Sequence, residues 1–215
     1  GNKSTMYFAE CTGVTTLTLW PHSHAFLSLY DGSSKWVPYN FDGVTLGVPG
    51  AANTTFDVFA YLNGQTPALE AVAWSDNHSR VSNLAATDGV FVKASDATRR
   101  YIGSFRTLAG GQTEDSSVNR LIYNQDNQIQ RPMRKPYADS SWTYASGTWR
   151  TANGNTANRV SFLLGCPSGS NHSQSLFSFN AVCQVSTTAG VQAAICVTSV
   201  DGNAPDFATD YTLVP

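Results

Sequence analysis

Carboxylates are the residues of this chain that could carry out catalytic chemistry, and glutamate is scarce among its 215 residues. Cleavage of a glycosidic bond generally needs two carboxylates that flank the bond. The three glutamates, Glu10, Glu70 and Glu114, are far apart in the sequence, and Glu114 with Asp115 suits a helix N-terminus. Four aspartates precede a glycine, so a turn role accounts for them: Asp31, Asp42, Asp88 and Asp201. The sequence therefore predicts a protein that is not an enzyme.

Histidine and cysteine are the residues that could bind a metal ion. On a strand, His22 and His24 would share one face, but no further ligand is close by in sequence, and we interpret them as loop residues. The cysteines show neither a C-x-x-C motif nor a histidine at zinc spacing: Cys11, Cys166, Cys183 and Cys196. We expect free, buried thiols, with a Cys166–Cys183 or Cys183–Cys196 disulfide as the open alternative. No metal and no cofactor are predicted.

Arginines form the densest positive region of the sequence. Their planar guanidinium groups favour bidentate pairing with carboxylates, either within the fold or across a subunit boundary. The carboxylates expected to pair with them are Asp96, Glu114, Asp115 and Asp126. Four are candidates for ion pairs between subunits: Arg99, Arg100, Arg106 and Arg120. The formal net charge of -2 gives no electrostatic footprint for nucleic acid, so no nucleic-acid partner is expected.

Tryptophan and tyrosine side chains could stack on sugars in a receptor site. A hairpin is predicted from residues 141 to 152, around Ser146-Gly147, and it carries Trp142, Tyr144 and Trp149. Packing in a core or an interface is the interpretation that we favour for these rings. Together with two arginines, they are the candidate interface or receptor contact: Trp142, Tyr144, Trp149, Arg131 and Arg134.

Short strands are the elements that must position these residues. Alternating apolar and polar residues predict a strand at 15–20 and a hairpin at 25–41 around the turn at 31–34. A second hairpin is predicted at 56–74, with Asn63-Gly64 in a type I′ turn. Its first strand carries aromatic residues on both faces, so we expect this strand to be covered on both sides.

One short helix is predicted near residues 115–127. The acidic segment from Thr113 to Ser116 is typical of a helix start, and Val118, Leu121 and Ile122 follow at helical spacing. Prolines predict an extended segment at 131–137.

About a dozen short strands with one helix predict an all-β fold, a β-sandwich with jelly-roll connectivity as one option. We expect an N-terminal arm at 1–14 and a β-rich scaffold at 15–160. The C-terminal strands, at 161–215, are expected to pack on the same sandwich.

Five segments carry a family resemblance in their order along the chain. They read LSLYDGSSKWVPYNF, TTFDVFAYLNGQTPALEAVAWS, DGVFVKASDATRRYIGSFRT, EDSSVNRLIYNQDNQIQRPMRK and DSSWTYASGTWRTANGNTAN. As a set, they resemble a group of phage and prophage proteins over about residues 25–158. LIYNQDNQIQ replaces a more aromatic run in that group, and the last fifty residues have no counterpart in it. The resemblance implies a virion structural component.

Within a virion, the resemblance implies a tail fibre or surface appendage component that serves in attachment. It further implies a homo-oligomer with a trimer favoured, other virion proteins as partners, and a host-surface glycan or protein as a further contact. No membrane insertion is expected, because no stretch approaches the roughly 18 apolar residues that cross a bilayer. The alternatives are a capsid decoration or cement protein, a secreted adhesion module, and a glycan-processing tailspike enzyme. A pair such as Glu70 and Asp76 in one cleft would favour the enzyme.

Overall fold

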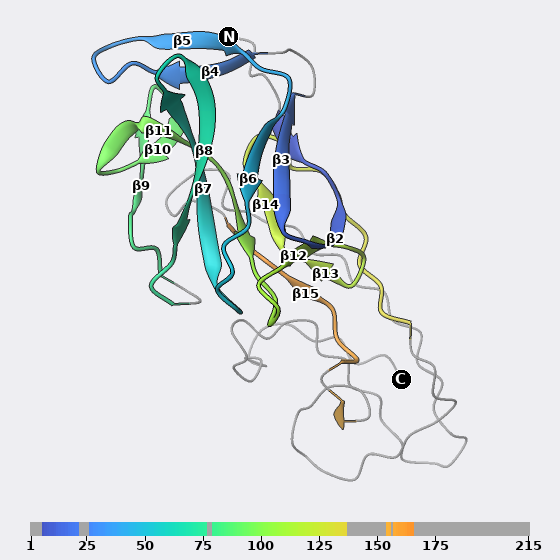
Figure 1. Cartoon of the computed structure of the whole chain (residues 1–215). Coiled ribbons are helices and arrows are strands. Elements are labelled where there is room, and N and C mark those ends of the chain that lie inside the picture. The colour runs from blue at the N-terminus through green and yellow to red at the C-terminus, as the bar shows by residue number, and fades with distance from the viewer. Residues whose placement is uncertain (1–5, 22–25, 77–78, 137–153, 156, 166–215) are drawn as a thin grey trace, which may run out of the picture. The chain divides into compact units, whose positions relative to one another are not determined.

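The computed structural model describes residues 6–21, 26–76, 79–136, 154–155 and 157–165, all of which belong to one compact unit, Gly1–Ser173 (Figure 1). The described residues form short β-strands in several sheets and contain no α-helix. The predicted all-β, sandwich-like fold is confirmed, whereas its jelly-roll connectivity stays a prediction. The hairpin predicted at 141–152 lies outside the described residues.

The largest sheet is built around β11, the longest strand. Its strands are β7 (Thr55–Asn63), β8 (Thr66–Ala73), β9 (Leu84–Thr87), β10 (Val90–Lys93), β11 (Asp96–Arg106) and β14 (Ile122–Asn124). They follow the order β8-β7-β11-β10-β9, and β14 also pairs with β11. All these pairs are antiparallel. One hairpin joins β7 to β8, and two further hairpins join β9 to β10 and β10 to β11.

Three smaller sheets accompany the large one. The first has the order β1-β3-β6, with β1 (Met6–Phe8), β3 (Thr16–Pro21) and β6 (Val44–Gly47). The second is the hairpin of β4 (Phe26–Tyr30) and β5 (Trp36–Asn40). The third has the order β15-β13-β12-β2, with β2 (Cys11–Val14), β12 (Thr113–Asp115), β13 (Asn119–Arg120) and β15 (Ser161–Phe162). From Met6 onward, the residues expected to form an arm thus contribute two strands to the sheets.

One hydrophobic core joins the large sheet to the first two small sheets. Strands with alternating burial point their apolar residues inward, as Leu17 and Leu19 of β3 do. The core residues of the large sheet include Phe56 and Phe105, whose rings stack with their centroids 5.2 Å apart. The buried members of the core are Phe8, Leu17, Leu19, Leu27, Leu29, Phe41, Leu46, Phe56, Val58, Ala60, Ile102, Phe105 and Ile122.

Two of the three predicted hairpins lie within the described residues and are present there, but one turn differs from its prediction. In the β7–β8 hairpin, Asn63 pairs with Thr66, so the two turn residues are Gly64 and Gln65. Among residues 63–66, Gly64 alone has a positive φ, at 66°. The predicted type I′ turn is therefore wrong, because that turn needs positive φ at both central residues. The predicted covering of β7 on both sides is confirmed, since Asp57 and Phe59, on the face away from the core, are also buried.

The helix predicted near 115–127 is wrong, because this segment folds as β12, β13 and β14. A turn replaces the expected first helical turn: the Ser116 N–H donates to the Asn119 carbonyl, and the Ser116 Oγ accepts the N–H groups of Val118 and Asn119. Serine hydroxyls offer the backbone such alternatives to a helix. Pairing with β2 and β11 then decides in favour of strands. Of the segment predicted to be extended, residues 131–136 are described and contain no helix, as its prolines require.

The turn of the β4–β5 hairpin depends on one aspartate. The Asp31 Oδ1 accepts the N–H groups of Ser33, Ser34 and Lys35 at 2.8, 3.0 and 3.0 Å. These bonds hold the pKa of the Asp31 carboxyl well below its ordinary value of 3.8. A carboxyl whose pKa is lowered by folding stabilises the fold above the unfolded-state pKa and loses that contribution as the pH falls through the folded pKa.

We expect Asp31→Asn to lower the melting temperature at pH 7, with a difference from wild type that shrinks as the pH falls below about 4. Thermal unfolding between pH 7 and pH 2 measures this difference. Asp42→Asn, at an exposed aspartate that also precedes a glycine, is the control and should change little at any pH. A difference for Asp31→Asn that did not vary with pH would contradict the role assigned to its ionised form.

Candidate functional site

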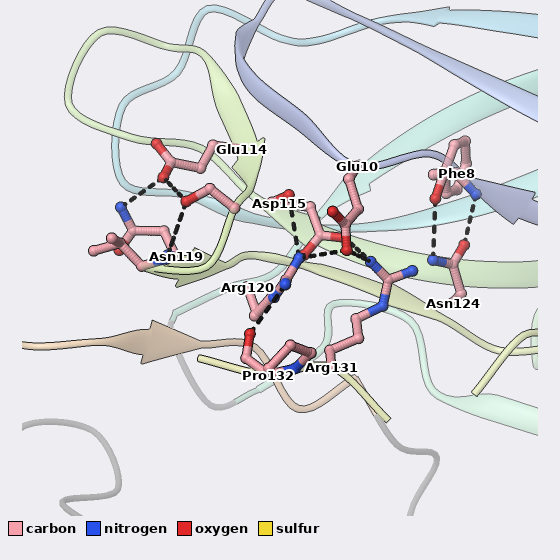
Figure 2. Close-up of polar contacts among 11 residues, drawn as sticks. Phe8, Glu10, Glu114, Asp115, Asn119, Arg120, Asn124, Arg131 and Pro132 are labelled. Atoms are coloured by element: carbon pink, nitrogen blue, oxygen red, sulfur yellow. Dashed lines mark hydrogen bonds and ion pairs between the residues drawn. The ribbon is translucent and has the colours of Figure 1, made fainter. Parts of the chain in front are cut away.

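Four charged side chains meet beside the small sheet that contains β12 and β13 (Figure 2). The Arg120 Nη1 lies 2.9 Å from the Glu10 Oε1 and 3.4 Å from the Asp115 Oδ1. The Arg131 Nη1 lies 3.4 Å from the same Glu10 oxygen and also pairs with the Asp115 Oδ2. We call Glu10, Asp115, Arg120 and Arg131 the ion-pair cluster. Of its members, Arg120 and Arg131 were predicted site residues and Asp115 was a predicted partner of arginine. Glu10 was not predicted to pair.

Strand pairing explains why these residues meet. Asp115 and Arg120 stand opposite each other where β12 pairs with β13. On its other side, β12 pairs with β2, and Cys11 stands opposite Asp115, which brings the preceding Glu10 close. The extended segment after β14 supplies Arg131. Its position is fixed because the Arg120 Nη2 donates to the Pro132 carbonyl at 3.0 Å.

The two carboxylates of the cluster differ in environment. The Asp115 side chain is fully buried, whereas 61% of the Glu10 side chain is exposed. Burial raises the pKa of the Asp115 carboxyl, and the Arg131 and Arg120 guanidinium groups oppose that shift. Because both Asp115 oxygens are paired with arginine, the cluster holds separate chain segments together and leaves neither oxygen without a partner.

The other arginines predicted as site residues also have partners within the chain. The Arg99 Nε lies 3.3 Å from Glu70, and the Arg100 Nη2 lies 2.9 Å from Asp126. The Arg106 Nη1 donates to the Thr55 Oγ1 at 3.3 Å. These contacts lie within the fold, which is one of the two arrangements that the sequence predicts for the arginines. The other arrangement, ion pairs between subunits, stays a prediction.

The candidate contact surface is described only in part. The Arg131 side chain is 15% exposed and belongs to the ion-pair cluster, while Arg134 is exposed and its N–H donates to the Ser117 carbonyl at 2.7 Å. The three aromatic residues of this candidate lie outside the described residues: Trp142, Tyr144 and Trp149.

A second polar network, on the outer face of the large sheet, was not predicted. The Arg80 Nε pairs with the Asp57 Oδ2 at 2.9 Å, and the Ser104 Oγ donates to the Asp57 Oδ1 at 2.7 Å. The Tyr101 hydroxyl lies 2.6 Å from the Ser104 Oγ and donates to the Gly165 carbonyl at 2.8 Å. A charged residue between aromatic neighbours in FDVFAYL was the available sequence signal for this network.

Burial governs the protonation of this network. It raises the pKa of the Tyr101 hydroxyl, and the nearby Asp57 carboxylate raises it further, so the hydroxyl remains a donor. Burial also raises the pKa of the Asp57 carboxyl, against the opposing effects of Arg80 and Ser104. The network thus supports the packing of the Gly165 segment on the outer face of the sheet.

The carboxylates considered for glycan cleavage are held in local contacts. The Glu70 Oε1 lies 3.3 Å from both the Lys93 Nζ and the Arg99 Nε. The Asp76 Oδ1 accepts the N–H of Ser79 at 2.7 Å. These partners provide a structural role for each carboxylate.

The described residues also bear on metal binding and on membrane insertion. Within those ranges, no group of three His, Cys, Asp or Glu side chains could hold a metal ion. No helix in the same ranges has the length and apolar character needed to cross a membrane. Cys11 is a free, half-buried thiol. The remaining candidates lie outside the described residues: His22, His24, Cys166, Cys183 and Cys196.

Comparisons of the chain with protein-family models, curated proteins and solved structures found no match. The resemblance to phage virion proteins accordingly stays a prediction from the sequence motifs.

Proposed function

We propose that this chain is a non-enzymatic structural protein of a bacteriophage particle, most consistent with a tail fibre or another surface appendage that serves in attachment. It acts by binding, as a homo-oligomer for which a trimer is favoured. Its partners are other virion proteins and a glycan or protein on the host surface.

The observation that carries this proposal is that the motif-bearing segments contact one another through their polar motif residues. Trp36, of the first segment, donates through its Nε1 to the Asp88 Oδ2 of the third at 3.2 Å. Ser104 of the third segment bonds Asp57 of the second. Arg100 of the third segment pairs with Asp126 of the fourth at 2.9 Å. The described motif residues thus serve to hold a scaffold together.

A scaffold of this kind suits a structural protein, because fold-specifying contacts stay inside the subunit while loops are free to differ between targets. The last fifty residues, which have no counterpart in the phage group, are therefore expected to carry differences in target or location. The low share of charged residues, 13%, suits a surface that works by close contact inside an assembly.

Purified particles provide the first test. Phage particles induced from the strain that encodes the chain would be separated on a density gradient, analysed by mass spectrometry and labelled with gold-linked antibody. We expect the chain in the particle fraction, with label at the tail or an appendage, and a trimer by light scattering of the purified chain. Label spread over the head would assign the decoration role instead. Absence from purified particles would overturn the proposal.

Attachment is tested separately through the predicted contact surface. Trp142→Ala combined with Trp149→Ala should lower the adsorption of particles to host cells while leaving the chain in the particles, since aromatic residues dominate many binding surfaces. Trp20→Ala is the control, because this ring is 41% exposed on β3 and belongs to another part of the chain. Equal adsorption by both variants would argue against the predicted contact surface.

A further inference from the structure

A pocket with a volume of about 400 Å³ lies where the ends of three strands come together. Arg106 is the last residue of β11, Asn119 is the first of β13, and Ser161 is the first of β15. All three line the pocket, together with Lys135 and Arg159. The pocket is separate from both the ion-pair cluster and the Asp57 network, since none of their residues lines it.

Backbone pairing brings the lining residues together. Asn119 stands beside Ser161 in the parallel pair of β13 with β15. The Arg106 N–H donates to the carbonyl of Leu121, immediately after β13, at 2.9 Å. Paired strands thus supply Arg106, Asn119 and Ser161, whereas Lys135 and Arg159 reach the pocket from segments outside the strands.

The charge of this pocket is unusual for this chain. Three cationic residues line it, Arg106, Lys135 and Arg159, and none of the described aspartates or glutamates does. Five arginines elsewhere in the described ranges are paired with carboxylates of the same chain: Arg80, Arg99, Arg100, Arg120 and Arg131. By contrast, Lys135 and Arg159 form no ion pair with any described residue. Like charges around one small cavity repel one another, so an anion in the cavity would be stabilised there.

Glu114 contacts the pocket wall without lining the pocket. Its Oε1 accepts hydrogen bonds from the Ser116 Oγ and from the Asn119 Nδ2, at 2.5 and 3.0 Å. One carboxylate cannot neutralise both Lys135 and Arg159. The Ser161 hydroxyl and the Asn53 amide add uncharged polar groups to the lining.

We propose that this pocket binds a small oxyanion, the phosphate, sulfate or carboxylate group of a ligand. Guanidinium groups match such oxyanions in geometry, because their N–H donors form a planar fork, and lysine adds a further positive charge. The proposal depends only on the pocket and holds whether or not the chain belongs to a phage particle.

The test measures saturable binding of three probes to the full chain: inorganic phosphate, inorganic sulfate and galacturonate. Ionic strength is kept constant with sodium chloride, and the shift in melting temperature and the amide NMR shifts of Asn119 and Ser161 are the readouts. We expect at least one probe to bind and to shift both amides. Preference for galacturonate would indicate an acidic sugar, whereas preference for an inorganic probe would indicate a phosphorylated or sulfated ligand.

Two double variants decide whether the probes bind in this pocket. Lys135→Gln with Arg159→Gln removes two charges from the lining and should weaken binding by about tenfold or more. Arg134→Gln with Lys35→Gln removes the same charge at exposed residues outside the lining, so at constant ionic strength its effect should be within about twofold. Equal weakening by both variants, or no saturable binding of any probe to wild type, would overturn the proposal. Melting temperatures without ligand verify that both variants fold.

Discussion

Replacing Gly103 with alanine is expected to cost about 3 kcal/mol or more of the free energy of unfolding. A Cβ at this position would lie 2.1 Å from the carbonyl oxygen of Tyr123 and 3.2 Å from its carbonyl carbon. Both atoms belong to the backbone of β14, which pairs with β11 at Gly103, Ser104 and Phe105. Because a backbone cannot rotate away as a side chain can, β14 must shift and its pairing with β11 must weaken.

Urea unfolding of the wild type and the Gly103→Ala variant measures this loss through the midpoint and slope of the transition. Gly47→Ala is the matched control, since Gly47 also lies in a strand but its Cβ would meet nothing within 4 Å. The control should leave the free energy of unfolding within about 1 kcal/mol of wild type. Similar midpoints for both variants would show that the approach of β14 to Gly103 does not constrain the fold.

Removing the buried carboxylate of the ion-pair cluster is the second large effect that we expect. Asp115→Ala deprives Arg120 and Arg131 of their buried partner and leaves two largely buried guanidinium groups with only the exposed Glu10. Breaking a buried ion pair by removing one partner costs about 3 to 5 kcal/mol. We therefore expect a loss of that size, together with weaker attachment of the extended segment that carries Arg131.

Glu10→Ala provides the matched comparison, because Glu10 contacts the same two arginines but is mostly exposed. Exposed ion pairs contribute at most about 1 kcal/mol. Urea unfolding of the two variants gives the difference, and hydrogen exchange at the Arg134 amide, which donates to Ser117, reports on the segment. Equal losses for Asp115→Ala and Glu10→Ala would contradict the importance assigned to burial.

Strand positions were predictable where one face of a strand is buried. Alternation at Leu17 and Leu19 predicted β3, and Asp31-Gly32 and Asn63-Gly64 located the two hairpins. The exact turn in the second hairpin was not predictable from Asn-Gly, because the pairing of Asn63 with Thr66 places the turn one residue later. Strand register depends on the partner strand as well as on the turn.

The ion pairs were predictable only in part. Asp96, Asp115 and Asp126 were expected partners of arginine, and each pairs with one, while Glu114 instead accepts hydrogen bonds from Ser116 and Asn119. Glu10 and Glu70 were missed as partners. Glu10 lies 110 residues from Arg120 in sequence, and no local pattern specifies so distant a contact.

The sequence by itself determined that this chain builds short β-strands around an apolar core, because strand alternation and turn residues act between near neighbours. The tertiary structure alone decided the conformation of Thr113 to Asn124. There the acidic residues that favour a helix start instead form a turn and a buried ion pair, since pairing with β2 and β11 satisfies both the backbone and the charge of Asp115. It also decided where Arg106, Lys135 and Arg159 meet, because the end of β11 and the segments that carry Lys135 and Arg159 come together only in the folded chain.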